Sequence, residues 1–194
     1  PDTGALDDPV RRDAERHSDL PAPDHALRKV GANTRDPDRG IARAARKLGG
    51  KRVDEDLGIE PSLRAAVEAA LGDLARAYVV ERGGATSLAG ERGHVVVRER
   101  LATADKVAGG GTAGELRRLD DALANVAGGR LTEAVRRDPN GAVRALLGRA
   151  VWTPDLTAAL EVQAVLPVGW LAVTRDGSAV VDAFTVRVGR GDSP

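Results

Sequence analysis

The chain contains nearly the same series of features twice. Each copy has two adjacent glycines, an acidic residue followed by proline, an Ala-rich segment closed by Leu-Gly, and a short apolar run. In the first copy these stand at Gly49-Gly50, Glu60-Pro61, 63–72 and 77–80, and in the second at Gly128-Gly129, Asp138-Pro139, 142–148 and 150–153. A recurrence in fixed order indicates a duplicated supersecondary unit. Two copies, with the proline spacing slipped by one residue, predict two facing subdomains rather than a solenoid.

Composition excludes several classes of protein. At 194 residues the chain has room for one domain or two small ones. It has no Cys, which excludes disulfides and thiolate metal sites and fits a reducing compartment. No run approaches 18 apolar residues, so no membrane-spanning helix is predicted. The formal net charge is zero and does not indicate the type of partner.

Helices and short strands alternate in the first half. Residues 1–40 are rich in Asp and Pro without apolar periodicity, which predicts a disordered segment. After it we expect helices at 41–48 and 61–71 and strands at 77–80 and 94–97. Gly83-Gly84 is expected to begin a loop, with one helical turn at 88–90.

The second half repeats this pattern and extends it. The Gly-rich segment 108–114 is predicted to be a linker. Thr153 is predicted to cap a helix that has Pro154 at its first position. The expected elements are helices at 115–126 and 154–166 and strands at 150–152, 170–174, 179–182 and 184–188, with a turn at Asp176-Gly177. The fold class is α/β (α+β), with similar subdomains at 41–107 and 115–194.

No catalytic, metal or cofactor site can be assembled from these residues. Gly109–Thr112 lacks the Lys of a phosphate-binding loop. The three histidines, His17, His25 and His94, stand singly, and no Gly-x-Ser-x-Gly or His-Glu-x-x-His motif occurs. We therefore expect no cofactor and no enzymatic activity, including no ATP hydrolysis, in this chain.

Basic residues gather near equivalent points of the two copies. They are either ordinary solvated side chains or a patch that contacts nucleic-acid phosphates without sequence preference. The residues are Lys51, Arg52, Arg98, Arg100, Arg136, Arg137, Arg144 and Arg149.

The order of elements resembles the hinge domain of bacterial SMC (structural maintenance of chromosomes) proteins. Residues 146–160 and 166–177 resemble its C-terminal half, and 59–80 its N-terminal half, so that the likeness covers roughly 49–182. The resemblance implies two similar α/β subdomains that dimerise two chains and contact DNA. It also implies a cytoplasmic, nucleoid-associated parent protein for chromosome condensation and segregation, with coiled-coil arms and ATPase heads outside this chain.

Sheet edges are the expected dimer contact. Short Val-rich sheets leave unpaired N–H and C=O groups, which a partner's other subdomain can satisfy. The last strand is placed there, with one face packed, and the following glycines would let backbones approach. The predicted interface is Phe184, Thr185, Val186, Arg187, Val188, Gly189 and Gly191.

Two alternatives remain open at this stage. The chain could be a stand-alone hinge-like oligomerisation or regulatory module without ATPase heads. It could also be a small-molecule-binding α/β enzyme, which the absence of a catalytic constellation disfavours.

Overall fold

The computed structural model describes residues 38–103 and 110–189. It mixes helices with short strands, which confirms the predicted α/β class. The predicted disordered segment lies outside the described residues except for its last three, which begin the first helix. Residues 108–109 of the predicted linker 108–114 also lie outside the described residues, so the domain boundaries there stay a prediction.

The described elements follow the order that the repeat predicts. The first half holds α1 (Asp38–Lys47), β1 (Lys51–Arg52), β2 (Gly58–Ile59), η1 (Pro61–Leu63), α2 (Arg64–Leu71), η2 (Gly72–Arg76), β3 (Tyr78–Val80), α3 (Arg82–Ser87), β4 (Val95–Val97) and α4 (Arg98–Leu101). The second holds α6 (Ala113–Asn125), β5 (Gly129–Arg130), η3 (Leu131–Ala134), β6 (Val135–Arg137), α7 (Ala142–Leu146), η4 (Leu147–Arg149), β7 (Ala150–Thr153), α8 (Leu156–Gln163), β8 (Leu171–Thr174), β9 (Ala179–Val181) and β10 (Val186–Val188).

The strand pairing repeats as well. In the first sheet, of order β1-β3-β4, β3 pairs antiparallel with β1 and parallel with β4. In the second, of order β10-β9-β8-β7-β5, β7 pairs in the same way with β5 and β8. The remaining equivalent strands, β2 and β6, pair antiparallel with each other. The two copies are thus related by a local two-fold arrangement centred on that pair.

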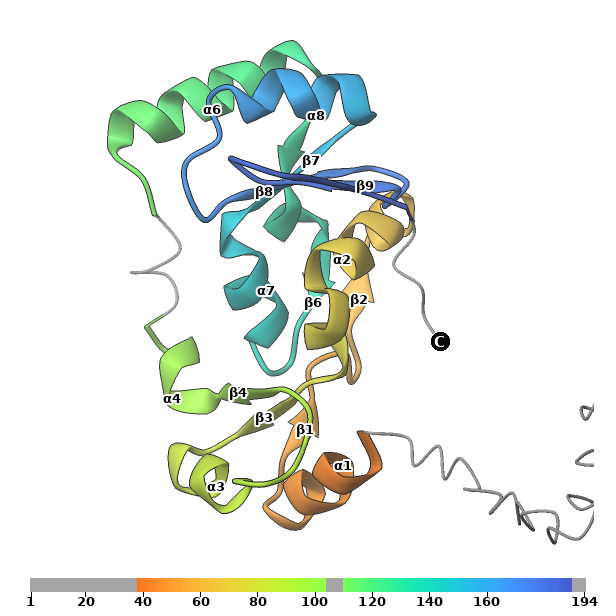
Figure 1. Cartoon of the computed structure of the whole chain (residues 1–194), viewed down its shortest axis with the longest axis vertical. Helices are drawn as coiled ribbons and strands as arrows, with labels where there is room; N and C mark the ends of the chain where they lie inside the picture. The colour runs from red at the N-terminus through yellow and green to blue at the C-terminus, as the bar shows by residue number, and fades with distance from the viewer. Residues whose placement is uncertain (1–37, 104–109, 190–194) are drawn as a thin grey trace, which may run out of the picture. The chain divides into compact units, whose positions relative to one another are not determined.

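Each sheet lies between an outer pair of helices and one central core (Figure 1). Helices α1 and α3 cover the outer face of the first sheet, and α6 and α8 cover that of the second. Alternate strand residues point inward, as the two-residue period of a strand requires. Val79 and Val96 of the first sheet thereby join Val173 and Val180 of the second in one buried cluster, around α2 and α7. The core is therefore shared by the two halves.

The outer helices α1 and α6 end in the same way. The N–H of Gly50 donates to the carbonyl of Ala45 at 2.9 Å, and that of Gly128 to Leu123 at 2.8 Å. Both bonds span five residues, the spacing of a Schellman helix end. Gly50 is therefore structurally equivalent to Gly128. An alignment of the two Gly-Gly pairs in the sequence would instead match Gly50 with Gly129, one residue later. The left-handed position before each is Gly49 in the first copy and Ala127, with φ of 54°, in the second.

Ala127 is consequently a strained residue that glycine should relieve. A left-handed conformation costs a residue with a Cβ on the order of 1 kcal/mol. We expect Ala127→Gly to raise the free energy of unfolding by up to about 1 kcal/mol, measured by urea denaturation. The reverse change at the equivalent position, Gly49→Ala, is the matched control and should lower it by a similar amount. Two shifts of the same sign would contradict this explanation.

Two helix starts differ from the prediction. Helix α8 begins at Leu156, and Asp155 rather than Thr153 is its N-cap, accepting from the N–H of Ala158 at 2.9 Å. Thr153 is fully buried and extends β7, because it pairs with Thr174 of the parallel neighbour β8. Helix α6 begins at Ala113, inside the predicted linker. The cause is a capping box in which Thr112 and Glu115 bond reciprocally, a pattern readable from their spacing.

Gly83 and Gly84 lie inside helix α3, so the predicted loop there is wrong. The predicted turn at 88–90 follows this helix, where the N–H of Glu91 donates to the carbonyl of Leu88 at 3.0 Å. Both carboxylate oxygens of Glu99 accept from the N–H of Arg82 at 3.0 Å at the start of this helix. The side chain of Leu48 lies close to Gly84. Packing and this distant carboxylate therefore outweigh the low helix propensity of glycine.

Candidate dimer interface

Strand β10 is an open edge of the five-stranded sheet. It pairs with β9 on one side, with Val186 opposite Val181 and Val188 opposite Ala179. No described strand pairs with its other side. All three of its residues are exposed, Val186 to 40% and Val188 to 68% of the residue's reference area. Exposed valines on an unpaired edge are the usual mark of a surface that another strand covers.

The backbone N–H and C=O groups of the two valines of β10 point away from the sheet edge. The N–H of Asp182 donates to the carbonyl of Thr185 at 3.0 Å, and that of Gly189 to Ser178 at 2.9 Å. Bonded and non-bonded pairs alternate along an antiparallel ladder, so Arg187 also bonds to β9. The N–H and C=O groups of Val186 and Val188 therefore face away from β9 and are available to a partner.

A rigid turn holds β10 in place. One carboxylate oxygen of Asp182 accepts from the N–H groups of Phe184 and Thr185, both at 2.8 Å. The other accepts from the Thr185 hydroxyl at 2.7 Å. That hydroxyl, followed by the two N–H groups, holds the pKa of Asp182 below its ordinary value. The side-chain amide of Gln163 on α8 donates to the Asp182 carbonyl at 2.7 Å, so the turn is also tied to a helix.

This turn corrects the predicted start of the last strand. The strand begins at Val186 rather than Phe184, because the Asp182 carboxylate takes the N–H groups that a ladder would use. Phe184, the one Phe of the chain, lies in the turn and is 80% exposed. Strand β10 is exposed throughout in the protomer, so the predicted packing of one of its faces stays a prediction for the dimer. Gly189 is exposed with φ of 114°, and Gly191 lies outside the described residues.

Strand β4 forms a second open edge. The N–H of Tyr78 on β3 donates to the carbonyl of His94 at 3.3 Å, and Tyr78 pairs with Val95. Alternate residues of a parallel strand bond to the same neighbour, so the N–H groups of Val95 and Val97 and the carbonyl of Val95 face away from β3. Val97 is the N-cap of α4, so its carbonyl accepts the first hydrogen bond of that helix. In the second half the equivalent strand, β8, has β9 on that side. The described part of the first half has no strand in that position.

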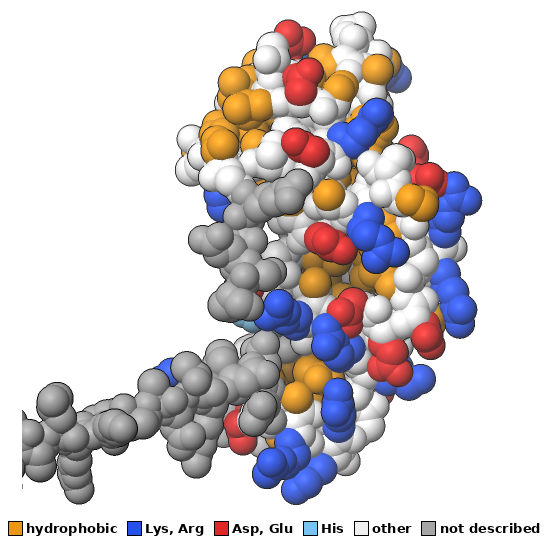
Figure 2. Space-filling model, turned by 90° about the vertical axis from the view of Figure 1, so that its right-hand side faces the viewer, with side chains coloured by type: hydrophobic (Ala, Val, Ile, Leu, Met, Phe, Trp, Pro, Cys, Tyr) orange, Lys and Arg blue, Asp and Glu red, His pale blue; other side chains and the backbone are white. Residues whose placement is uncertain are grey.

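Several of the eight predicted phosphate-contacting residues have partners within the protein. Arg98 pairs with Glu81 at 2.9 Å, and Arg136 pairs with Glu60. The guanidinium of Arg144 donates to the carbonyl of Val135 at 2.6 Å. Figure 2 shows basic and acidic side chains interspersed on the face that it draws. Arg100 and Arg149 line a cleft, and Lys51 and Arg137 are exposed. The ion pairs of Arg98 and Arg136 were not predictable from the spacing of residues in the sequence.

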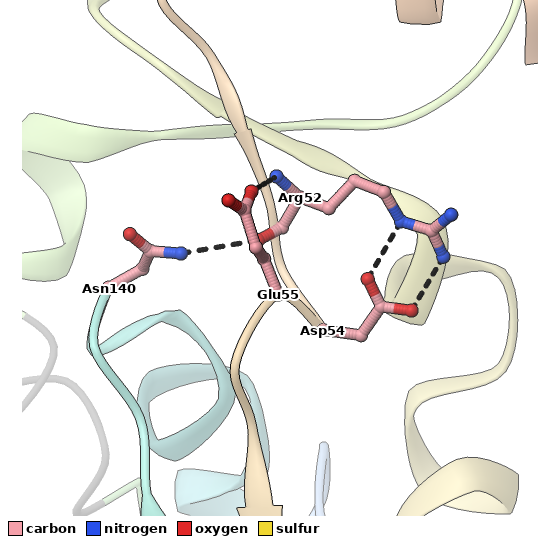
Figure 3. Close-up of polar contacts among 4 residues, drawn as sticks. All are labelled: Arg52, Asp54, Glu55 and Asn140. Carbon is pink, nitrogen blue, oxygen red and sulfur yellow. Dashed lines mark hydrogen bonds and ion pairs between the residues drawn. The ribbon is translucent and has the colours of Figure 1, made fainter.

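Arg52 has a structural role at the join between the halves (Figure 3). Its guanidinium binds Asp54 at 2.7 and 2.5 Å, and its N–H donates to Glu55 at 3.3 Å. Its carbonyl accepts from the side-chain amide of Asn140 at 3.2 Å. Asn140 belongs to the loop between β6 and α7, so this bond connects the second half to β1 of the first.

The structure shows a basic face on helix α1 that was not predicted from the sequence. Arg43, Arg46 and Lys47 on α1 are exposed, and no carboxylate partner is present for them in the described part of the chain. Their spacing of three and four residues places them on one side of the helix. That spacing could have been read from the sequence. Basic side chains gather at the lower end of the face in Figure 2, the end at which α1 lies.

The described residues hold no cluster of three or more His, Cys, Asp or Glu side chains that could bind a metal ion. Within the same residues, no helix has the length and apolar character needed to cross a membrane.

Comparison with solved structures identifies the fold. No protein-family profile matches the chain, and no curated protein matches its sequence. The chain is similar to the SMC hinge domain of Geobacillus stearothermophilus, solved as an asymmetric dimer, with a TM-score of 0.62 and 22% identity. The match covers 84% of this chain and 69% of that one. The described residues therefore have the fold of an SMC hinge domain.

Proposed function

We propose that this chain is an SMC hinge-type dimerisation module in which β10 of one protomer pairs with β4 of the other. The observation that carries the proposal is the presence of two open strand edges of matching length. Strand β10 turns the N–H and C=O groups of Val186 and Val188 outward, and β4 turns outward both groups of Val95 and the N–H of Val97. A two-fold dimer makes the contact twice and leaves neither edge open.

The internal repeat gives the direction of this pairing. Strand β4 occupies the position in the first sheet that β8 occupies in the second. The neighbour of β8 is β9, which runs antiparallel to it. If the partner's β10 takes the corresponding place beside β4, the two strands run antiparallel.

The faces of the two sheets match in this arrangement. Val186 lies opposite Val181, whose side chain packs against the outer helices of the second sheet. Val95 packs against the outer helices of the first sheet. Directly opposed residues point to the same face of a sheet. The joined sheet therefore has outer helices on one face and the two central cores on the other.

The oligomeric state of the full chain tests the proposal. We expect sedimentation equilibrium at tens of micromolar to give twice the mass of the 20.2 kDa chain. A monomer at that concentration would rule out the dimerisation module. The proposal assigns no catalytic step to this chain. Coiled-coil arms and ATPase heads beside it in the parent protein would distinguish a chromosome-organising SMC protein from a stand-alone oligomerisation module.

A weak contact with DNA is the second candidate function, and the basic face of α1 supports it. Its three exposed cations have no carboxylate partner among the described residues, unlike Arg98 and Arg136. Such a contact would be indifferent to sequence and would weaken as salt rises, because it releases counterions from the phosphates.

Charge reversal on α1 should weaken this DNA binding. In a gel-shift titration at low salt, we expect Arg43→Glu/Arg46→Glu/Lys47→Glu to lower affinity by at least about tenfold, since several phosphate contacts are lost. The matched comparison is Arg136→Glu/Arg137→Glu on β6, which should have a smaller effect because Arg136 is already paired with Glu60. Equal affinity of the triple variant and the unaltered chain would exclude α1 as the contact.

A further inference from the structure

A cleft lies at the C-terminal end of β4, between the two halves of the protomer. Its volume is about 340 Å³. Strand β4 and helix α4 form one wall, and α7, η4 and the start of β8 form the other. The lining includes Val97, Arg100, Leu101, Leu146, Arg149 and Leu171. The cleft is therefore mainly apolar, with two guanidinium groups among its lining residues.

The surface that could fill this cleft is the turn before β10. Phe184 stands at that turn and is 80% exposed as a residue, although burial of an aromatic side chain is strongly favourable. The Asp182 carboxylate fixes the turn through hydrogen bonds to the backbone of Phe184 and Thr185. Phe184 is thus presented in a defined position before any partner binds, which lowers the entropy cost of a contact.

We infer that Phe184 of one protomer inserts into this cleft of its partner. The inference rests on the proposed dimer, in which β10 runs antiparallel to the partner's β4. Val186 then lies opposite either Val95 or Val97 of the partner. In both registers, Phe184, two residues earlier in the chain, lies at or beyond the C-terminal end of that β4. This is the end at which the cleft is found.

The chemistry of the two surfaces is complementary. Asp182 stays ionised because its pKa is lowered, and Arg100 and Arg149 of the partner carry the opposite charge. A guanidinium can also stack on an aromatic ring. This chain already uses that contact at both of its Trp residues, with Arg130 over Trp170 and Arg175 over Trp152, each 4.6 Å from the ring centre.

Intermolecular disulfides test the insertion separately from the dimer, because the chain has no Cys of its own. Protomers with Phe184→Cys would be mixed with protomers with Leu101→Cys, and covalent heterodimers counted on a non-reducing gel. A disulfide needs a Cα separation below about 7 Å. Mixtures of Val186→Cys with Val95→Cys or Val97→Cys report the strand pairing alone. Val168→Cys, at an exposed apolar residue of the loop before β8, is the control for random collision.

We expect the Phe184 and Leu101 pair to cross-link above the Val168 control. We also expect Phe184→Ala to weaken dimerisation by at least about tenfold, as for an aromatic hot spot, while Val168→Ala leaves it unchanged. Cross-linking of the Val186 pairs without the Phe184 pair would overturn the insertion and keep the dimer. A full-chain monomer without any cross-link would overturn both.

Discussion

Val186→Pro should convert the dimer to a monomer and leave the protomer folded. Proline removes the backbone N–H at this position, and that N–H faces away from β9 toward the partner. The outer edge would lose a ladder donor in both copies of the contact. We expect the dissociation constant to rise by at least about a hundredfold, measured by sedimentation equilibrium, with the circular dichroism spectrum unchanged.

Arg187→Pro is the matched control, because the N–H of the next residue points the other way. It bonds to β9 within the protomer, so proline there should lower the free energy of unfolding by roughly 1 to 3 kcal/mol, because the acceptor on β9 loses its partner. A Val186→Pro chain that stays dimeric would show that β10 is not the contact. Equal loss of stability in the two variants would show that the assignment of inward and outward residues on β10 is wrong.

Gly177→Ala should cause a large loss of stability. Gly177 has φ of 70° in the turn between β8 and β9, and a Cβ there would lie 2.6 Å from the carbonyl oxygen of Ala65 on α2. The turn is not free to move away. Asp176 accepts from the Thr174 hydroxyl at 2.7 Å and from the Ser178 N–H at 3.0 Å. The Ser178 N–H, followed by the Thr174 hydroxyl, lowers the pKa of Asp176 to about 2.

We expect Gly177→Ala to cost about 3 kcal/mol or more in urea denaturation, from backbone strain and the clash with α2 together. Gly141→Ala is the matched control, since Gly141 has φ of 68° and open space where the Cβ would be. It should cost about 1 kcal/mol. If the two costs are equal, the turn does not support the packing of the two halves.

The succession of helices and strands was predictable because short-range chemistry determines it. Adjacent glycines end α1, Pro61 begins the helical segment that leads into α2, and Asp176-Gly177 makes the turn between β8 and β9. The pairing of β2 with β6 was not predictable. These strands have two and three residues, too few to show a period, and their partners lie far apart in the chain. The ion pair between Glu60 and Arg136 was not predictable for the same reason, because these residues lie 76 positions apart in the sequence.

The candidate interface was predictable in part for similar reasons. The last apolar segment identified the edge strand, since Val186 and Val188 alternate with a charged residue. The predicted start of this strand was wrong because the Asp182 carboxylate, rather than the backbone of a neighbouring strand, accepts from the N–H groups of Phe184 and Thr185. The second edge, β4, follows only from the sheet order. A sequence period shows which residues are buried, but it does not show that β4 lacks a neighbour on one side.

The single central core acts as a rigid spacer between the two open edges. Buried residues from both halves, such as Val67 and Leu131, fill the space between the sheets, so β4 and β10 cannot shift independently. Closing a two-fold pair requires both contacts to form at once, and the distance between them is set by this interior. In the proposed dimer, the spacing between the two contacts would therefore be set by residues that touch no partner. A substitution deep in the core could tune how the two protomers close without altering either contact surface.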